Sequence, residues 1–412
     1  LKDERVNIIH GDGRFFVKQR AGDNAYDTII LGLPDPHTAM MNRFYSLEFF
    51  REIKKILAPG GVFSFSLSSS ENYINPENAL YLGCIYHTLE KVFPEIKVFP
   101  GNNVIFLAAD KKNALTYDTD ILIKRLRDRR LDLKFVREYY MPFKLNPLRI
   151  KYVESVIKES GAKKINLDFR PIGYFYNMLL WLTLFKSGKG FLAYLDIINI
   201  YSLVAVIVLL FVAVFLAQKI SRASFKMPVV LSIGTTGLSE IAFQLVVILA
   251  FQSIYGYLYY KIGLILTFFM IGLVAGSAVI NRQLERIRDE RSLYIKTQAV
   301  ICIYPLILPL MLGLASKTSA ANQYAEMIFA ALPIIAGFLG GFQFPLANKI
   351  CLKTSKNAGR TTGLLYGVDL FGACIGGLLI GLFFIPVLGI IQTCVLLSVI
   401  NALVLALLHS AP

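Results

Sequence analysis

Charged residues are scarce in this sequence. Only 17% of its 412 residues are Asp, Glu, Lys or Arg, whereas 55% are apolar. Soluble domains usually carry about 25% charged residues, so the composition excludes an ordinary soluble protein and predicts a membrane protein. The apolar excess begins after Ser202, and residues 1–170 have the composition of a soluble domain. We therefore expect a soluble part followed by a membrane part.

Cysteine and histidine are also rare, and neither is clustered. The five cysteines show no CxxC or other paired spacing, and the four histidines show no spacing typical of metal ligands. The sequence therefore predicts neither a disulfide framework nor a metal site. The formal net charge of +15 could indicate nucleic acid, but the basic residues lie largely in short loops between apolar spans. Orientation in a lipid bilayer explains that placement, and we expect no nucleic-acid partner.

The stretch from Tyr26 to Ser70 has the pattern strand, long loop, helix, strand. Asp27–Leu31 is a short apolar run closed by Gly32, and Phe44–Leu57 carries apolar residues at helical spacing. Pro59-Gly60-Gly61 ends that helix before a strand at 62–67. Such a unit is a βαβ crossover, and parallel sheets bind ligands at the carboxyl ends of their strands, here the loop 32–36. Further strands are predicted at 6–10, 96–99 and 104–109, and further helices at 14–20, 76–93 and 147–160.

The loop Gly32-Leu-Pro-Asp-Pro36, together with Asp3–Gly13, resembles the second half of a spermidine synthase (polyamine aminopropyltransferase) domain. The resemblance is strongest to spermidine-synthase-like domains fused to membrane helices, and Asn166–Pro171 extends it weakly. It implies part of a Rossmann-like, S-adenosylmethionine-type sheet, of strand order 3-2-1-4-5-7-6. Strands one and two would precede Leu1, so we expect a fragment of a longer protein, a poorly paired strand at 6–10 and an exposed sheet edge.

The resemblance also implies ligand-binding residues. Asp12 and Gly13 match the residues that contact the nucleoside of the aminopropyl donor, decarboxylated S-adenosylmethionine. The alternative is a tight turn in which Asp12 caps a helix. Asp35 matches an aspartate that binds the cationic polyamine, and its alternative is a turn residue between two prolines.

Gly32 stands where the resembled family has its catalytic aspartate. An amine must lose a proton before it attacks the carbon beside a sulfonium, and glycine cannot accept that proton. His37 could act as a base instead, or be an ordinary loop residue. We therefore expect impaired aminopropyl transfer and no activity from this chain by itself, and whether the protein is an enzyme stays open. The serine run 66–70 beside Glu71 either lines a pocket or simply ends a strand.

Seven nearly charge-free spans of about 20 residues predict transmembrane helices, which places the protein as a multi-pass protein of a cytoplasmic or inner membrane. They lie at about 196–218, 228–256, 262–281, 295–315, 325–347, 361–385 and 388–408. The shorter run 172–185, which contains the only Trp, predicts an interfacial helix. Alternate loops are basic, which favours an external soluble domain; a cytoplasmic one requires an extra crossing near 172–185.

Glu240 and Asp369 are the carboxylates well inside these spans. Burying one as a charge costs at least ~2.5–3.5 kcal/mol, so each is either a functional residue or a cap near the end of its span. Five GxxxG patterns favour close helix packing: Gly272xxxGly276, Gly337xxxGly341, Gly363xxxGly367, Gly372xxxGly376 and Gly377xxxGly381.

The expected architecture has three parts. Residues 1–115 form a partial spermidine-synthase-like α/β domain, 116–195 a helical linker with the interfacial helix, and 196–412 a transmembrane bundle. The first functional hypothesis is a membrane-bound spermidine-synthase-like protein with an impaired transferase site, whose partners are the bilayer and a small cationic ligand such as a polyamine. The second is a non-catalytic ligand-binding module coupled to a transporter- or sensor-like membrane domain through Glu240 and Asp369.

Overall fold

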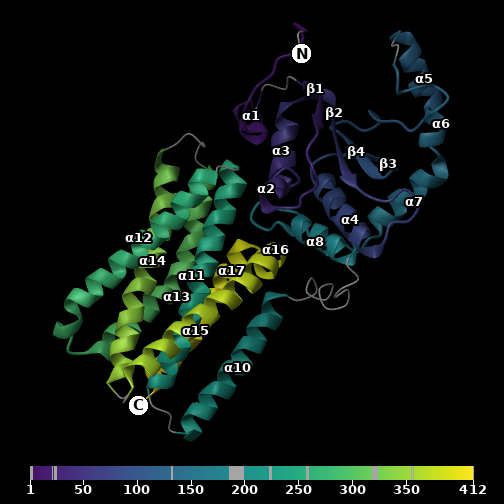
Figure 1. Ribbon diagram of the computed structural model, residues 1–412. Coiled ribbons are helices and arrows are strands. Elements are labelled where there is room, and N and C mark those ends of the chain that lie inside the picture. Colours follow the sequence, from purple (N-terminus) through teal and green to yellow (C-terminus); the bar gives the residue numbers. More distant parts are fainter. Residues whose placement is uncertain are drawn as a thin grey trace. The chain divides into compact units, whose positions relative to one another are not determined.

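The computed structural model divides the chain into two compact units, Leu1–Lys189 and Gly190–Pro412, which are described separately below. The described residues are 3–20, 22, 26–130, 133–184, 199–221, 225–256, 259–317, 323–353, 355 and 357–411. The first unit is a mixed α/β domain, and the second consists of long helices (Figure 1). This confirms the predicted fold class.

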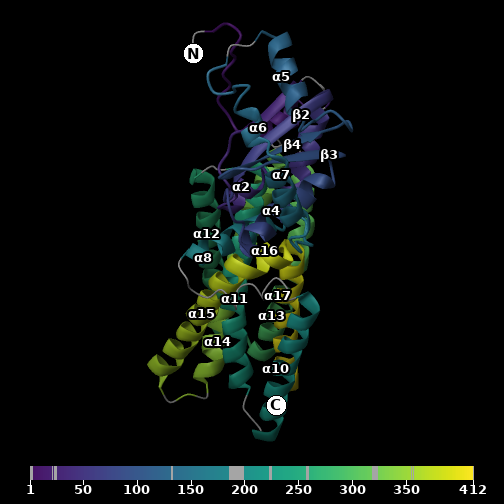
Figure 2. The same ribbon diagram turned by 90° about the vertical axis from the view of Figure 1, so that its right-hand side faces the viewer.

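A four-stranded sheet with the order β1-β2-β4-β3 forms the centre of the first unit. Strand β1 (Tyr26–Leu31) pairs in parallel with β2 (Leu57–Ser68), whereas β4 (Asn103–Ala109) pairs antiparallel with both β2 and β3 (Glu95–Phe99). Strands β2, β4 and β3 lie side by side in both views (Figures 1 and 2). If β1 is the fourth strand of the resembled sheet, this is the expected order 4-5-7-6.

Helices with side-chain caps connect these strands. They are α1 (Gly13–Gln19), α2 (Ala39–Asn42), α3 (Leu47–Ile56) and α4 (Pro76–Glu90), and the capping residues are Asp12, Thr38, Ser46 and Asn75. The core between α3 and the sheet is aromatic: the Phe50 and Phe106 rings stack on opposite sides of Phe65, at centroid distances of 5.8 Å and 5.0 Å. The packing of α3 on the sheet therefore holds both ends of the β1–α3–β2 crossover, which contains the loop after β1.

The predicted strand at 6–10 is not present: these residues have no strand partner among the described residues. Val6, Ile8 and Ile9 are 46%, 52% and 57% exposed, and Ile30 of the edge strand β1 is 75% exposed. A strand requires a neighbour to satisfy its backbone N–H and C=O groups. The expected poor pairing and exposed edge are thus both observed.

The helices after the sheet belong to the first unit. They are α5 (Thr119–Asp128), α6 (Met141–Lys144), α7 (Pro147–Lys158) and α8 (Ile172–Leu184). Helix α8 packs against α4 and buries Ile172, Phe175 and Tyr176 completely, while Trp181 is half-exposed. Helix α8 therefore packs inside this unit with one face, and the interfacial placement of 172–185 stays a prediction. The rest of the predicted linker, 185–195, lies outside the described residues.

Six helices of the second unit are long and apolar enough to cross a membrane. Their ranges are Lys226–Tyr255, Lys261–Arg286, Glu290–Ala315, Glu326–Leu352, Ala358–Leu388 and Ile390–Ser410. They contain α11 (Lys226–Tyr255), α12 (Tyr259–Gln283), α13 (Glu290–Lys317), α14 (Gln323–Leu352), α15 (Ala358–Leu379), α16 (Ile385–Leu388) and α17 (Ile390–Ser410). The remaining predicted span corresponds to α10 (Ile200–Ser221), whose apolar segment Ile200–Leu216 is shorter.

Glycines bring two helix pairs of this unit close together. A Cβ on Gly272 would lie 2.2 Å from the Ile334 carbonyl oxygen, and one on Gly341 would lie 2.1 Å from that of Leu273, so α12 and α14 touch through their backbones. A Cβ on Gly372 of α15 would lie 2.0 Å from the Gly234 carbonyl oxygen of α11. These contacts confirm close packing for three of the five glycine patterns. Gly363 and Gly367, by contrast, face open space.

Candidate functional site

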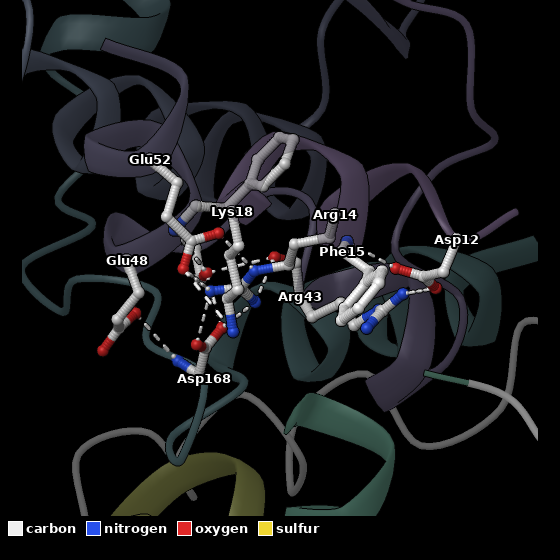
Figure 3. Close-up of polar contacts among 10 residues, drawn as sticks. Asp12, Arg14, Phe15, Lys18, Arg43, Glu48, Glu52 and Asp168 are labelled. Carbon is white, nitrogen blue, oxygen red and sulfur yellow. Dashed lines mark hydrogen bonds and ion pairs between the residues drawn. The ribbon is translucent and has the colours of Figure 1, made fainter. Parts of the chain in front are cut away.

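Asp12 lies at the start of α1, directly after the unpaired segment 6–10. Its carboxylate accepts a hydrogen bond of 3.0 Å from the Phe15 N–H and forms an ion pair with the buried Arg43 (Figure 3). The helix-capping role of Asp12 is therefore present in the structure. Arg43 lies over the Phe44 ring, 4.6 Å from its centroid, and burial lowers the pKa of its guanidinium more than the charge of Asp12 raises it.

Arg14, two residues after Asp12, forms ion pairs with two carboxylates. Its guanidinium is 1% exposed and bonds both carboxylate oxygens of Glu52 at 2.7 and 2.9 Å and both of Asp168 at 2.8 and 2.7 Å (Figure 3). Burial disfavours the charged form, but the two carboxylates outweigh it, and the pKa of Arg14 rises above its ordinary value. The sequence analysis missed Arg14, although it adjoins Gly13 and its partner Asp168 lies in the weakly matching segment Asn166–Pro171.

Asp35 follows β1 and is buried, with 6% of its surface exposed. Its Oδ1 accepts a hydrogen bond of 3.1 Å from the Ser68 N–H at the end of β2, so the carboxylate lies where two parallel strands end. The Tyr45 hydroxyl donates to the carbonyl oxygens of Leu33 and Pro34 in the same loop. Burial and the charge of Asp35 together raise the pKa of Tyr45 above its ordinary value.

Helix α8 also contributes to this loop, which the sequence analysis did not anticipate. His37 Nδ1 lies 2.8 Å from Oδ1 of Asn177, a buried residue of α8, and the His37 ring meets the edge of Trp181 at a centroid distance of 5.8 Å. A neutral histidine donates from one ring nitrogen and accepts at the other. A bond from Nδ1–H to Asn177 Oδ1 leaves Nε2 as the acceptor.

Gly32 lies at the end of β1, is exposed, and has no heavy atom within 4 Å of the position that a Cβ would occupy. A Cβ at position 32 therefore meets no neighbour. The structure thus brings Gly32, Asp35 and His37 onto one loop, while Asp12 and Gly13 lie at the start of α1.

Glu71, just after the serine run, lines a cavity of about 430 Å³ together with Phe99, Arg137, Tyr140 and Lys144. The Glu71 carboxylate bonds Arg149 at 2.7 Å, and this bond lowers the pKa of Glu71. Because its charge is already paired, Glu71 serves first to attach the loop after β2 to α7.

The second unit contains a polar cavity of about 190 Å³ that both intramembrane carboxylates line. Glu240 comes from α11 and Asp369 from α15, and the hydroxyl residues Thr236, Ser277 and Tyr366 complete the polar lining. Glu240 and Asp369, predicted as candidates separately, are thus members of one cavity. Within the described ranges, no group of three or more His, Cys, Asp or Glu side chains could hold a metal ion.

Residues 1–117 match the family model "Spermine/spermidine synthase domain". Three curated relatives, all polyamine aminopropyltransferases, are similar to this region. The protein of Sulfolobus acidocaldarius is 29% identical, in an alignment that covers 31% of this chain and 42% of the relative. The protein of Nitrosomonas europaea is 28% identical, and the alignment covers 42% of this chain and 55% of the relative. The protein of Thermoplasma volcanium is 34% identical, and the alignment covers 24% of this chain and 33% of the relative. The chain therefore spans only about half, or less, of the relatives that it matches.

Fold and site together define an α/β domain with its polar loop at the strand ends, followed by long apolar helices. Within this architecture, residues 1–117 form a spermidine-synthase-like domain.

Proposed function

We propose that the first unit binds an aminopropyl donor of the decarboxylated S-adenosylmethionine type and a polyamine, with transfer between them impaired. The observation that carries the proposal is the position of Asp35 and Gly32 on the loop after β1 of a domain similar to polyamine aminopropyltransferases. Asp35 supplies a carboxylate for the cationic amine. Asp12, as cap of α1, and Gly13 are proposed to contact the nucleoside.

The proposed slow transfer follows from the missing proton acceptor at position 32. In aminopropyl transfer, the amine gives up a proton, its lone pair attacks the carbon beside the sulfonium, and the carbon–sulfur bond breaks to release a neutral thioether. The Asp35 carboxylate is already bonded to the Ser68 N–H, and Gly32 offers no side chain. His37 Nε2 is then the remaining acceptor on this loop. Because a well-positioned base typically contributes 10²–10⁴-fold and the family's carboxylate is replaced, we expect binding with little turnover.

Calorimetry on the full-length protein tests the binding step. Decarboxylated S-adenosylmethionine and putrescine are titrated separately and together into the wild type and Asp35→Asn. We expect the wild type to bind both, and Asp35→Asn to bind the donor normally but putrescine at least about tenfold more weakly, because one charge pair is lost. Unchanged putrescine binding in Asp35→Asn would contradict the assignment of Asp35.

A second candidate function is a ligand-binding module coupled to a transporter- or sensor-like membrane unit. It is favoured by the cavity that Glu240 and Asp369 share, because intramembrane carboxylates facing a cavity are typical of ligand or ion sites. The two functions are compatible, since they use different units of the chain.

A further inference from the structure

We propose that the cavity between α11, α12, α14 and α15 binds a small aliphatic diamine, whose two ammonium groups pair with Glu240 and Asp369. The cavity volume is about 190 Å³, several times the ~30 Å³ that a water molecule occupies in the liquid. The space is therefore large enough for an organic molecule. The proposal concerns the second unit alone and is independent of the function proposed for the first.

Within the described residues, the two carboxylates have no counterpart. Neither Glu240 nor Asp369 has a hydrogen-bond donor or a cationic partner there, although the carboxylates Glu290 and Glu326 of the same unit are both paired with lysines. An ionised carboxylate at membrane depth is costly without a cation beside it, and otherwise takes up a proton. A cationic ligand from outside the chain would stabilise the ionised form of both groups.

Two glycines, which have no side chain, leave the space that these carboxylates occupy. A Cβ on Gly340 would lie 1.4 Å from Glu240 Oε1, and a Cβ on Gly237 would lie 2.5 Å from Asp369 Oδ1. Any other residue at position 340 would displace the Glu240 carboxylate. The two glycines thus allow the charged groups to sit against the neighbouring helices at the edge of the cavity.

The polar groups behind the cavity are satisfied by one another. Thr236 donates to Gln343 at 2.6 Å, Gln343 to Gln298 at 2.6 Å, Gln298 to Asn401 at 3.0 Å, and Asn401 to Ser239 at 2.8 Å. All five residues are buried, on helices α11, α13, α14 and α17. This network fixes one wall of the cavity and provides no counter-charge for the carboxylates.

One buried amide of α11 has no acceptor. Gln244 is 9% exposed, and its Nε2 has no hydrogen-bond partner among the described residues. It lies four residues after Glu240, so the two side chains project from the same face of the helix. A buried donor without a partner costs free energy, which a water molecule bound together with the ligand can recover.

The lining selects the class of ligand. Two ionised carboxylates are balanced by two positive charges, and Ile233, Leu273 and Phe344 add apolar surface to the same lining. A hard divalent ion prefers six or more oxygen ligands and leaves apolar walls unused. An aliphatic diamine carries two ammonium groups on a hydrocarbon chain, which matches both features.

Calorimetry with 1,4-diaminobutane tests this site on the full chain in lipid nanodiscs. The Asp35→Asn variant serves as the background, so that binding of the same diamine by the first unit is weakened and separates from binding by the cavity. We expect Glu240→Gln and Asp369→Asn each to weaken binding at least about tenfold, because each removes one charge pair while preserving side-chain shape. The matched control Glu326→Gln removes a carboxylate of α14 outside the cavity and should leave the affinity unchanged.

Two further measurements keep the result interpretable. n-Butylamine, with one ammonium group, should bind at least about tenfold more weakly than the diamine; equal affinity would overturn the two-carboxylate arrangement. Mass spectrometry should also show that the diamine protects Glu240 of the wild-type protein from dicyclohexylcarbodiimide, a readout that needs no variant to fold. Absence of protection, or equal diamine binding in both amide variants, would overturn the proposal.

Discussion

Arg14 joins parts of the first unit that lie far apart in the sequence. Its guanidinium is shared between Glu52 of α3 and Asp168, which lies just before α8. Because α1 begins at Asp12, the same interaction fixes the cap residue that we propose for nucleoside contact. The Arg14 side chain thereby connects the family-matched region with residues beyond it.

Replacing Arg14 should destabilise the first unit strongly. Arg14→Met removes the buried cation that Glu52 and Asp168 share and leaves Glu52 only the more distant Lys18. Breaking a buried pair typically costs about 3–5 kcal/mol. Urea unfolding followed by the fluorescence of Trp181, the only tryptophan, reports on this unit selectively. Lys18→Met is the control, because Lys18 lies 3.9 Å from Glu52 and is more exposed. An equal, small effect of both substitutions would contradict the role given to Arg14.

The ion pair between Glu71 and Arg149 should make stability depend on pH. The hydrogen bond from Arg149 lowers the pKa of Glu71, so the pair stabilises the fold above the ordinary glutamate pKa of ~4.3. That contribution is lost as the pH falls through the lowered pKa. Thermal unfolding followed by Trp181 fluorescence should therefore separate wild type from Glu71→Gln more at pH 7 than at pH 3. An equal separation at the two pH values would rule out the pair as its cause, and Glu159→Gln serves as an exposed control.

At the scale of elements, the close helix pairs of the second unit depend on glycine. Gly276→Val places a side chain against α14, where a Cβ alone would lie 2.2 Å from the Phe338 carbonyl oxygen. Forcing atoms into a packed contact typically costs 1–3 kcal/mol, so we expect a lower melting temperature in detergent. Gly363→Val adds the same side chain where a Cβ meets open space, and it should leave the melting temperature unchanged. Equal shifts in the two variants would argue against backbone contact between α12 and α14.

Periodicity predicted most elements but not their partners. The crossover from β1 to β2, the helix α4 and six long apolar helices were recognisable, because local patterns determine them. The segment 6–10 has the apolar pattern of a strand yet remains unpaired, since pairing depends on a neighbouring strand. The contact of α8 with α4 was likewise not visible in its hydropathy, and the interfacial placement of this helix stays a prediction.

In the candidate site, too, local features could be predicted from the sequence but long-range contacts could not. Asp35 and Gly32 could be predicted from their loop, because residue type and position after a strand are visible in the sequence. The contacts of Arg14 with Asp168 and of His37 with Asn177 span 154 and 140 positions, and no local pattern indicates them. The shared cavity of Glu240 and Asp369 likewise arises from the packing of α11 against α15.

For the whole molecule, the basic loops predict a first unit outside the cytoplasm. Cys84 is fully buried, so an exposed position such as Lys112→Cys is the suitable labelling site. We expect an impermeant maleimide to label Lys112→Cys in intact cells as strongly as in lysed cells. Labelling only after lysis would place the unit in the cytoplasm, which requires either a further crossing before α10 or an α10 that does not cross.

The most direct test of the central claim is an aminopropyl-transfer assay on the full-length protein and its Gly32→Asp variant. A Cβ at position 32 meets no heavy atom within 4 Å, and an aspartate there supplies the proton acceptor that we hold to be missing. We predict that the wild type binds donor and putrescine with little transfer, and that Gly32→Asp raises the transfer rate by about 10²-fold or more. Fast transfer by the wild type, or no gain in Gly32→Asp despite normal binding of both ligands, would contradict the account.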